Sequence, residues 1–295
     1  MIITRKGSLI EILCPAKLNL YLEIRGKRAD GYHEIETIMQ TISVYDRLVI
    51  EPAASGTEIR CSDPEIPCGN ENTVWKAVDQ VRRATGAAGG VKIFVEKAIP
   101  AGGGLAGGSS DAAGAIAGLN ELWQLGLSKS SMEEIGAAAG SDVPFFFTAG
   151  AAICRGRGEK VTPLAVNQRP LQFVVVFPGF GISTKEIYQR LKLDLTEQQD
   201  TGRIFELAKC LASGQAADLG REFFNRLEQT ALEARPDLDK VKRSMVREGL
   251  LGVTMSGSGS SFFGLCERKE VHSEKKHELS ASGVGIVFAC ESTSR

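Results

Sequence analysis

Residues 16–24 alternate between apolar and polar side chains. One face of this segment is entirely apolar, and the other face carries Lys17, Asn19, Tyr21 and Glu23. This period of two predicts a β-strand with one buried face and one solvated face. The same alternation over residues 91–96 predicts a second strand.

Apolar residues at helical spacing follow Asn72, whose side chain suits a helix N-cap, and they predict a helix that ends near Thr85. Further helices are predicted over 110–125 and 130–140. In the second half, strands are predicted at 171–177, 250–255, 261–266 and 284–289, and helices at 184–192, 203–213, 220–234, 237–248 and 269–281. Pro163 and the polar stretch 167–170 indicate a boundary between two domains, which we set at 1–164 and 165–295.

The charge balance excludes several classes of protein. The 295 residues include 35 Lys and Arg against 36 Asp and Glu, a net charge of −1. Such a chain has no strong field of one sign, which argues against a dedicated nucleic-acid or membrane-surface protein. No apolar run approaches the ~18 residues of a membrane span, and the start lacks the order of a signal peptide. We therefore expect a cytoplasmic protein.

Cysteine and histidine usage also limits the possible sites. The seven cysteines are scattered without a C-x-x-C pair, and there are only three histidines. This usage argues against a disulfide framework and against a zinc site held by the protein.

The 33 glycines concentrate at 102–108 and 256–259. The first cluster lies between a predicted strand and a predicted helix, and Ser109 and Ser110 follow it. Backbone N–H groups can crowd around an anion where glycines remove the Cβ atoms, and the first N–H groups of a helix add to such a cradle. Either serine could cap the helix, bond a phosphate oxygen or reach a Mg²⁺ ion.

Three interpretations of this loop compete. It could be a flexible loop with a serine cap, a dinucleotide-binding loop, or a phosphate loop of a kinase. Gly102, Gly104 and Gly107 satisfy G-x-G-x-x-G, but the stretch about 20 residues later continues the helix, whereas a dinucleotide site needs an acidic residue after a second strand. No G-K-[ST] follows the glycines, so a Walker-type loop is excluded.

Other segments admit a structural and a functional interpretation side by side. Lys17 and Asn19 could belong to a solvated strand face, and His33 could be a hydrogen-bonded structural histidine. Asp142, just before Val143-Pro144, could be a cap or a general base. The segment 255–261 could be a hairpin turn of small residues.

The residues Pro100 to Ala113 resemble the phosphate loop of the GHMP kinases, the superfamily of galactokinase, homoserine kinase and mevalonate kinase. Ala106 stands where many members have glycine, and alanine disfavours positive φ. The longer form of the loop and the block Pro15 to His33 resemble one branch, whose members phosphorylate 4-diphosphocytidyl-2-C-methyl-D-erythritol in the non-mevalonate isoprenoid pathway. Segments 139–145 and 255–261 are similar to two further motifs of the superfamily.

The resemblance implies a role for each of these segments. It implies that Lys17 and Asp142 are catalytic, with Asp142 as general base and Lys17 as its electrostatic partner. It implies that Asn19 lines the polyol of the substrate, that Tyr32 and His33 hold its cytosine, and that Thr184 and Tyr188 lie near the diphosphocytidyl group. It also implies that segment 255–261 braces the phosphate loop. It places Asn72 and Lys97 near the adenine of ATP. The loop residues that it assigns to ATP are Pro100, Ala101, Gly102, Gly103, Gly104, Leu105, Ala106, Gly107, Gly108, Ser109 and Ser110.

The fold that the resemblance implies is α+β, a two-domain GHMP kinase fold with a ribosomal protein S5 domain 2-like N-terminal domain and a ferredoxin-like C-terminal domain. ATP and Mg²⁺ carried on its phosphates are the implied cofactors; the protein ligands of the metal stay unassigned. Three rivals remain open: another small-molecule kinase of the superfamily, a nucleotide sensor without catalysis, and a nicotinamide oxidoreductase.

Overall fold

The computed structural model describes residues 1–148, 150–167, 169–192, 202–214 and 216–294. The chain forms two compact units that interleave along the sequence. Unit 1 comprises residues 1–16, 44–99 and 106–149, and unit 2 comprises residues 17–43, 100–105 and 150–295. The long strands β2 (Leu9–Lys27) and β3 (His33–Ala53) each contribute residues to both units. The domain boundary between residues 164 and 165 stays a prediction.

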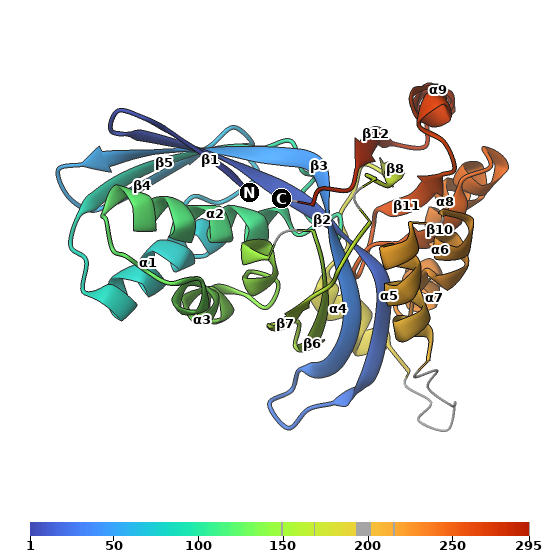
Figure 1. Cartoon of the computed structure of the whole chain (residues 1–295), viewed down its shortest axis with the longest axis horizontal. Helices are drawn as coiled ribbons and strands as arrows, with labels where there is room; N and C mark the ends of the chain where they lie inside the picture. Colours follow the sequence, from blue (N-terminus) through green and yellow to red (C-terminus); the bar gives the residue numbers. More distant parts are fainter. Residues whose placement is uncertain (149, 168, 193–201, 215, 295) are drawn as a thin grey trace. The chain divides into compact units, whose positions relative to one another are not determined.

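Unit 1 is a sheet with helices on one side, as Figure 1 shows for α1, α2 and α3 beside the strands β1, β4 and β5. The strand order is β1-β2-β3-β5-β4; β4 runs parallel to β5, whereas β1 with β2 and β3 with β5 are antiparallel. Its elements outside β2 and β3 are β1 (Ile2–Lys6), β4 (Thr57–Cys61), α1 (Thr73–Thr85), β5 (Gly90–Glu96), α2 (Gly107–Leu122), α3 (Lys129–Ala139) and the 3-10 turn η1 (Pro144–Phe147).

The helix predicted after Asn72 is confirmed. Asn72 is the N-cap of α1, and its side-chain oxygen accepts a hydrogen bond from the Val74 N–H at 2.7 Å. The helix ends at Gly86, a left-handed residue whose N–H donates to the Arg82 carbonyl. The predicted strand 91–96 is confirmed as β5.

Unit 2 contains the other part of β2 and β3, extended by short strands, and a separate sheet. The short strands are β6 (Ala151–Gly156), β7 (Lys160–Pro163) and β9 (Phe224–Asn225). The separate sheet is antiparallel with the order β10-β11-β8-β12, built from β8 (Gln172–Phe177), β10 (Leu251–Met255), β11 (Phe262–Cys266) and β12 (Ile286–Glu291). Numbered along the chain, its strands lie in the order 4-1-3-2 when read from β12, which is the ferredoxin-like arrangement.

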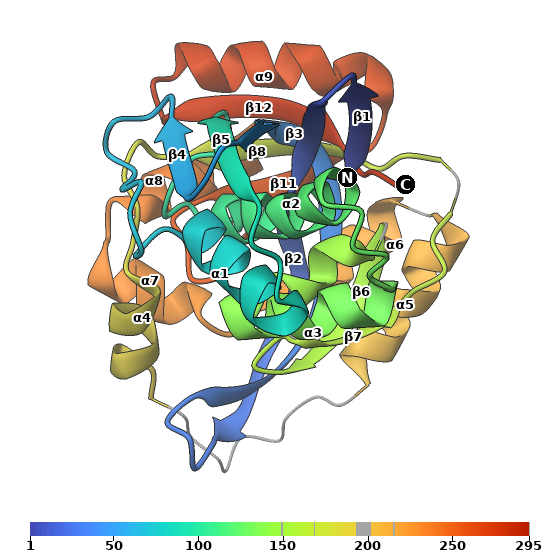
Figure 2. The same ribbon diagram turned by 90° about the vertical axis from the view of Figure 1, so that its left-hand side faces the viewer.

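Helices pack on this sheet, and Figure 2 shows α9 running beside β12. One core cluster joins β8, β11 and β12 to apolar side chains of α7, α8 and α9. The helices of unit 2 are α4 (Thr184–Arg190), α5 (Arg203–Ser213), α6 (Ala216–Glu222), α7 (Glu228–Ala234), α8 (Leu238–Arg247), the 3-10 turn η2 (Lys269–Val271) and α9 (His272–Ala281).

The single helix predicted over 220–234 is wrong, because Asn225 interrupts it. The Asn225 amide donates to the carbonyls of Met255 at 2.7 Å and Gly257 at 2.8 Å, and its oxygen accepts from the Leu227 N–H at 2.9 Å. These bonds hold residues 224–225 beside β2, so α6 ends before them and α7 begins after them. An asparagine that bonds backbone groups in this way competes with helix formation.

The half-buried strand predicted over 16–24 is wrong in one respect, because both of its faces are buried. Lys17 is 3% exposed, Asn19 is 2% exposed and Glu23 is 2% exposed. A solvated strand face is therefore excluded for Lys17 and Asn19. Buried polar groups need partners inside the protein, and these partners form part of the candidate site.

Candidate active site

The glycine loop from Pro100 to Ser110 has a backbone suited to anions. Gly102, Gly104 and Ala106 have φ values of 67°, 76° and 57°, all in the left-handed region. Nests of backbone N–H groups that bind anions are built with such left-handed residues. Ala106 adopts this conformation although it carries a Cβ atom, so the alanine does not prevent the loop geometry.

The helix after the loop begins earlier than predicted, and neither serine caps it. α2 begins at Gly107 rather than at residue 110, and its N-cap is Ala106, which makes no side-chain capping bond. The N–H groups of Ser109 and Ser110 donate to the Ala106 carbonyl at 3.1 and 3.0 Å. The first N–H groups of a helix have no partner within it and lie at the positive end of its dipole, which favours a phosphate there.

The turn at 255–261 packs against the first half of the loop. The Ser261 N–H donates to the Gly103 carbonyl at 3.1 Å, and Ser256 Oγ donates to the Gly104 carbonyl at 3.0 Å. A Cβ atom on Gly104 would overlap the Ser256 carbonyl oxygen, so the two segments touch at the backbone. This packing agrees with the bracing role that the resemblance implies.

Lys17 and Asn19 form a hydrogen-bonded pair on β2. Lys17 Nζ donates to Asn19 Oδ1 and to the Gly104 carbonyl, both at 2.6 Å. Asn19 Nδ2 donates to Thr37 Oγ1 at 2.9 Å. The Lys17 N–H also donates to the Leu105 carbonyl at 3.1 Å. The structure therefore brings Lys17 to the phosphate loop and uses both ends of the Asn19 amide; the contact of Asn19 with a polyol stays a prediction.

Asn72 and Thr73 stand at the start of α1. The Asn72 side chain caps the helix, and its Nδ2 donates to the Pro67 carbonyl at 2.6 Å. Thr73 Oγ1 donates to the Gly108 carbonyl at 2.9 Å, which joins the first turns of α1 and α2. The contact of Asn72 with adenine stays a prediction.

Asp142 lies in unit 1 between α3 and η1, and it is partly exposed. The 3-10 turn η1 has Val143 as its N-cap residue and no side-chain capping bond. Asp142 therefore makes no capping bond to this turn, although residues 141–143 themselves form a turn before Pro144. Its catalytic role stays a prediction.

The residues predicted to hold a nucleobase come from separate segments of unit 2. The rings of His33 and Tyr188 lie with their centroids 4.9 Å apart and their planes tilted by 37°. Burial, helped by the charge of Lys27, lowers the pKa of His33, which favours the neutral imidazole. The Tyr32 ring is 53% exposed, and the guanidinium of Arg157 lies over it at 4.9 Å.

Thr184 is the first residue of α4, and its hydroxyl lies 2.8 Å from Ser258 Oγ in the 255–261 turn. This contact joins α4 to the turn, and a contact of Thr184 with substrate stays a prediction. Sequence analysis did not single out Arg157, because nothing in the linear sequence relates it to Tyr32, 125 positions earlier.

Sequence analysis also missed two acids that surround Lys97. Lys97 Nζ donates to the carboxylates of Asp46 and Asp111. Asp111 directly follows the glycine loop, but nothing in the linear sequence relates it to Lys97. The contact of Lys97 with adenine stays a prediction, and these partners are considered further below.

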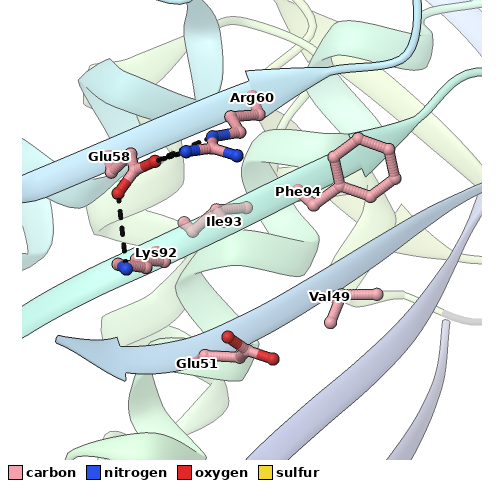
Figure 3. A pocket seen from close by; sticks show the side chains of 7 residues that line it. All are labelled: Val49, Glu51, Glu58, Arg60, Lys92, Ile93 and Phe94. Carbon is pink, nitrogen blue, oxygen red and sulfur yellow. Dashed lines mark hydrogen bonds and ion pairs between the residues drawn. The ribbon is translucent and has the colours of Figure 1, made fainter.

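A hollow of about 310 Å³ lies on the outer face of the unit 1 sheet, as Figure 3 shows. Glu58 contacts both basic side chains that line it, Arg60 at 2.7 Å and Lys92 at 3.7 Å, and Glu51 adds a second acid. None of the lining residues is a predicted site residue, and two acids against two bases leave no excess positive charge for a phosphate. The hollow is therefore not the candidate site.

Within the described part of the chain, no helix is long and apolar enough to cross a membrane. In the same part, no three His, Cys, Asp or Glu side chains are grouped so that they could hold a metal ion.

Comparison with known proteins gives the family. The model of the GHMP kinases N-terminal domain matches residues 72–150, and that of the GHMP kinases C-terminal domain matches residues 207–285. A protein of Carboxydothermus hydrogenoformans named 4-diphosphocytidyl-2-C-methyl-D-erythritol kinase is 43% identical over 92% of this chain and 93% of its own length. A protein of the same name from Pelotomaculum thermopropionicum is 40% identical over 87% of this chain and 88% of its own length.

A solved structure of a protein with this activity in its name is also similar to the chain. The crystal structure of a 4-(cytidine 5'-diphospho)-2C-methyl-D-erythritol kinase is 36% identical, with a TM-score of 0.81 over 97% of this chain and all of that chain. The resemblance seen in the sequence and the predicted two-domain α+β fold are therefore confirmed. The chain is a small-molecule kinase of the GHMP superfamily, and it belongs to the 4-diphosphocytidyl-2-C-methyl-D-erythritol kinase family.

Proposed function

We propose that this kinase transfers the γ-phosphate of ATP to the 2-hydroxyl of 4-diphosphocytidyl-2-C-methyl-D-erythritol, a step of the non-mevalonate isoprenoid pathway. The names of the relatives support this substrate, since they cover most of the chain at 40% identity and above. The observation that carries the proposal is the buried Lys17, whose ammonium donates to the Gly104 carbonyl within the phosphate loop.

The loop residues 100–110 hold the triphosphate in this proposal, through backbone N–H groups and the start of α2. Mg²⁺ belongs with the nucleotide, where it neutralises charge on the phosphates. Asn19 keeps the Lys17 ammonium pointed at the loop, because its Oδ1 accepts a hydrogen bond at 2.6 Å and its Nδ2 is anchored on Thr37. From this position the charge of the ammonium balances charge at the transferring phosphoryl group.

Asp142 acts as the general base. Its carboxylate accepts the proton of the substrate hydroxyl while the hydroxyl oxygen forms a bond to the γ-phosphorus. The bond from that phosphorus to the β,γ-bridging oxygen breaks, and ADP leaves with the electron pair. Lys17 is the electrostatic partner of this base. Base catalysis of this type contributes about 10²–10⁴ in rate.

The nucleobase of the substrate lies at the aromatic group formed by Tyr32, His33 and Tyr188. A neutral imidazole offers one donor and one acceptor to the edge of cytosine. Tyr188 offers a ring face for stacking, and it already lies 4.9 Å from the ring of His33. The GHMP kinase N-terminal domain is proposed to cover residues 1–164 and the C-terminal domain residues 165–295.

The test is a steady-state assay with ATP and either the cytidine-linked substrate or the bare polyol 2-C-methyl-D-erythritol. We expect turnover of the first alone, since the polyol lacks the group that the aromatic residues bind. Asp142→Asn should bind ATP normally and lose at least ~10² in kcat. Equal turnover of both acceptors would refute the substrate, and near-normal kcat in the variant would remove Asp142 from the mechanism.

A further inference from the structure

The ammonium of Lys97, just after β5, is enclosed by two carboxylates. Nζ donates to Asp46 Oδ2 and, at 2.7 Å, to Asp111 Oδ2. The side chains of Lys97, Asp46 and Asp111 are 8%, 0% and 4% exposed. Desolvating three charges is costly, and removing one partner from such a group leaves a charge without compensation. Both of these hydrogen bonds of the Lys97 ammonium are made to carboxylates inside the protein.

Asp46 connects this cluster to the beginning of α2. Its Oδ1 accepts hydrogen bonds from the N–H groups of Ala98 and Ile99 at 2.7 and 2.8 Å. Its Oδ2 lies directly against Gly107, where an added Cβ atom would come within 3.0 Å of it. The first residue of α2 therefore rests on the carboxylate that also holds Lys97.

Asp111 lies four residues after Gly107, on the same side of the helix. The charged and titratable groups that face it are Cys14 from β2, Asp46 from β3 and Lys97 from the segment after β5. Burial raises the pKa of Asp111 to about 7; Lys97 opposes this rise and Asp46 adds to it. Burial also acts to lower the pKa of Lys97, but the two carboxylates outweigh it and raise that pKa. Lys97 thus stays charged.

A second contact holds the same turn from another side. Thr73 Oγ1, at the start of α1, donates to the Gly108 carbonyl at 2.9 Å. The first turn of α2 is therefore fixed by the acidic cluster at Gly107 and Asp111 and by a hydroxyl at Gly108.

We propose that Lys97 is a positioning residue, which acts through Asp46 and Asp111 to fix the first turn of α2 and so the backbone N–H groups that face the phosphates. The inference rests on the proposed function of this turn as a cradle for the ATP phosphates. It assigns Lys97 a role different from the adenine contact that the family resemblance implies. Asp46 and Asp111 are positioning residues in the same sense.

The test compares ATP with adenosine, because the two ligands share the base and differ in the phosphates. Binding of each to Lys97→Met is measured by calorimetry. We expect ATP to bind about tenfold or more weakly, since the loss of one hydrogen bond to a charged phosphate is enough for about a tenfold loss of affinity. Adenosine should bind within about twofold of wild type. An equal loss for both ligands would make Lys97 a ligand of the base and overturn the inference; no loss for either would also overturn it.

A second variant tests the role of the carboxylates. Asp111→Asn added to Lys97→Met removes one of the two acids that have lost their counter-ion, so it should restore ATP affinity by about threefold or more. The matched control is Glu96→Gln in the same background. Glu96 adjoins Lys97 in sequence but is exposed and pairs with Arg47 at 3.0 Å, so this change should restore nothing. Equal effects of the two changes would refute the coupling.

Two outcomes concern folding and the proposed function. If Lys97→Met alone does not fold, the double variant Lys97→Met/Asp111→Asn carries the comparison of ATP with adenosine. If the wild-type chain binds neither ATP nor its analogues, the proposed function fails. If wild type binds ATP and the variants weaken ATP and adenosine equally, the proposed function stands and the inference about Lys97 fails.

Discussion

Gly104→Ala tests whether close backbone contact between the phosphate loop and the 255–261 turn is required. Gly104 has φ +76°, and an added Cβ atom would overlap the Ser256 carbonyl oxygen and lie 3.0 Å from that of Gly259. Neither atom belongs to a side chain that can rotate away. The substitution must therefore displace one backbone segment from the other.

The expected cost has two parts. A left-handed conformation costs a residue with a Cβ atom about 1–2 kcal/mol, and forcing an extra group into a packed region costs about 1–3 kcal/mol. Gly86→Ala is the matched control, since Gly86 has φ +72° at the end of α1 and nothing within 4 Å of the added atom. We expect a loss of about 2–5 kcal/mol at Gly104 and about 1–2 kcal/mol at Gly86.

Urea unfolding of the two variants gives the free energies, and calorimetry with ATP gives the functional effect. A displaced loop that loses one or two backbone hydrogen bonds to the phosphates should bind ATP about 10–10²-fold more weakly, since each such bond contributes about 1.5–3 kcal/mol. Gly86→Ala should bind ATP within about twofold of wild type. Equal losses of stability in the two variants, together with normal ATP binding by Gly104→Ala, would show that the contact with the turn is dispensable.

The remaining predictions concern pH, a helix cap and the nucleobase site. The pKa of Asp111 is raised from 3.8 to about 7 in the folded chain, so the folded state holds a proton that the unfolded state releases, and stability falls as pH rises through that window. At ~1.4 kcal/mol per pH unit, the free energy of unfolding should fall by up to about 4 kcal/mol. Urea unfolding between pH 4 and 8 should show this fall in wild type and in the control Glu96→Gln, but not in Asp111→Asn. The same dependence of stability on pH in wild type and Asp111→Asn would contradict the prediction. Asn72→Ala should lower the free energy of unfolding, measured by urea denaturation, by ~1 kcal/mol, whereas Asn72→Ser should leave it unchanged because serine also caps helices. A Ser variant of normal stability that binds ATP weakly would indicate that Asn72 contacts adenine. Tyr188→Ala should raise KM for the cytidine substrate roughly tenfold without changing KM for ATP, whereas Phe205→Ala, at an exposed aromatic, should change neither; an unchanged KM would remove Tyr188 from the site.

The sequence predicted correctly the helices and strands whose ends are determined by neighbouring residues in the chain, and α1 is an example. Asn72 and Gly86 directly flank α1 at its two ends, so a short window of sequence contains the whole signal for this helix. The start of α2 was misplaced for the opposite reason. Glycine has low helix propensity, and Gly107 and Gly108 are helical because Asp46 and Thr73, distant in sequence, pack against them.

Contacts between residues that are distant in sequence also limited what could be predicted about the site. Family motifs identified Lys17 and the phosphate loop, and the structure joins them through the Gly104 carbonyl. The alternation along β2 could not reveal that its polar face is buried, because Thr37 and Asn225 reach that strand from other parts of the chain. Likewise the partners of Lys97 lie 51 residues before it and 14 residues after it. Long-range charge pairing leaves no periodic signal in one sequence.

Ala106, between the glycine loop and α2, is a left-handed residue that carries a Cβ atom. The chain passes from unit 2 to unit 1 between Leu105 and Ala106. On one side of this bond the Leu105 carbonyl accepts from the Lys17 N–H, and on the other the Ala106 carbonyl accepts from Ser109 and Ser110. A left-handed alanine persists only where its surroundings determine the backbone more strongly than its own preference does. The left-handed conformation of Ala106 is therefore maintained by hydrogen bonds to its own carbonyl group and to that of Leu105.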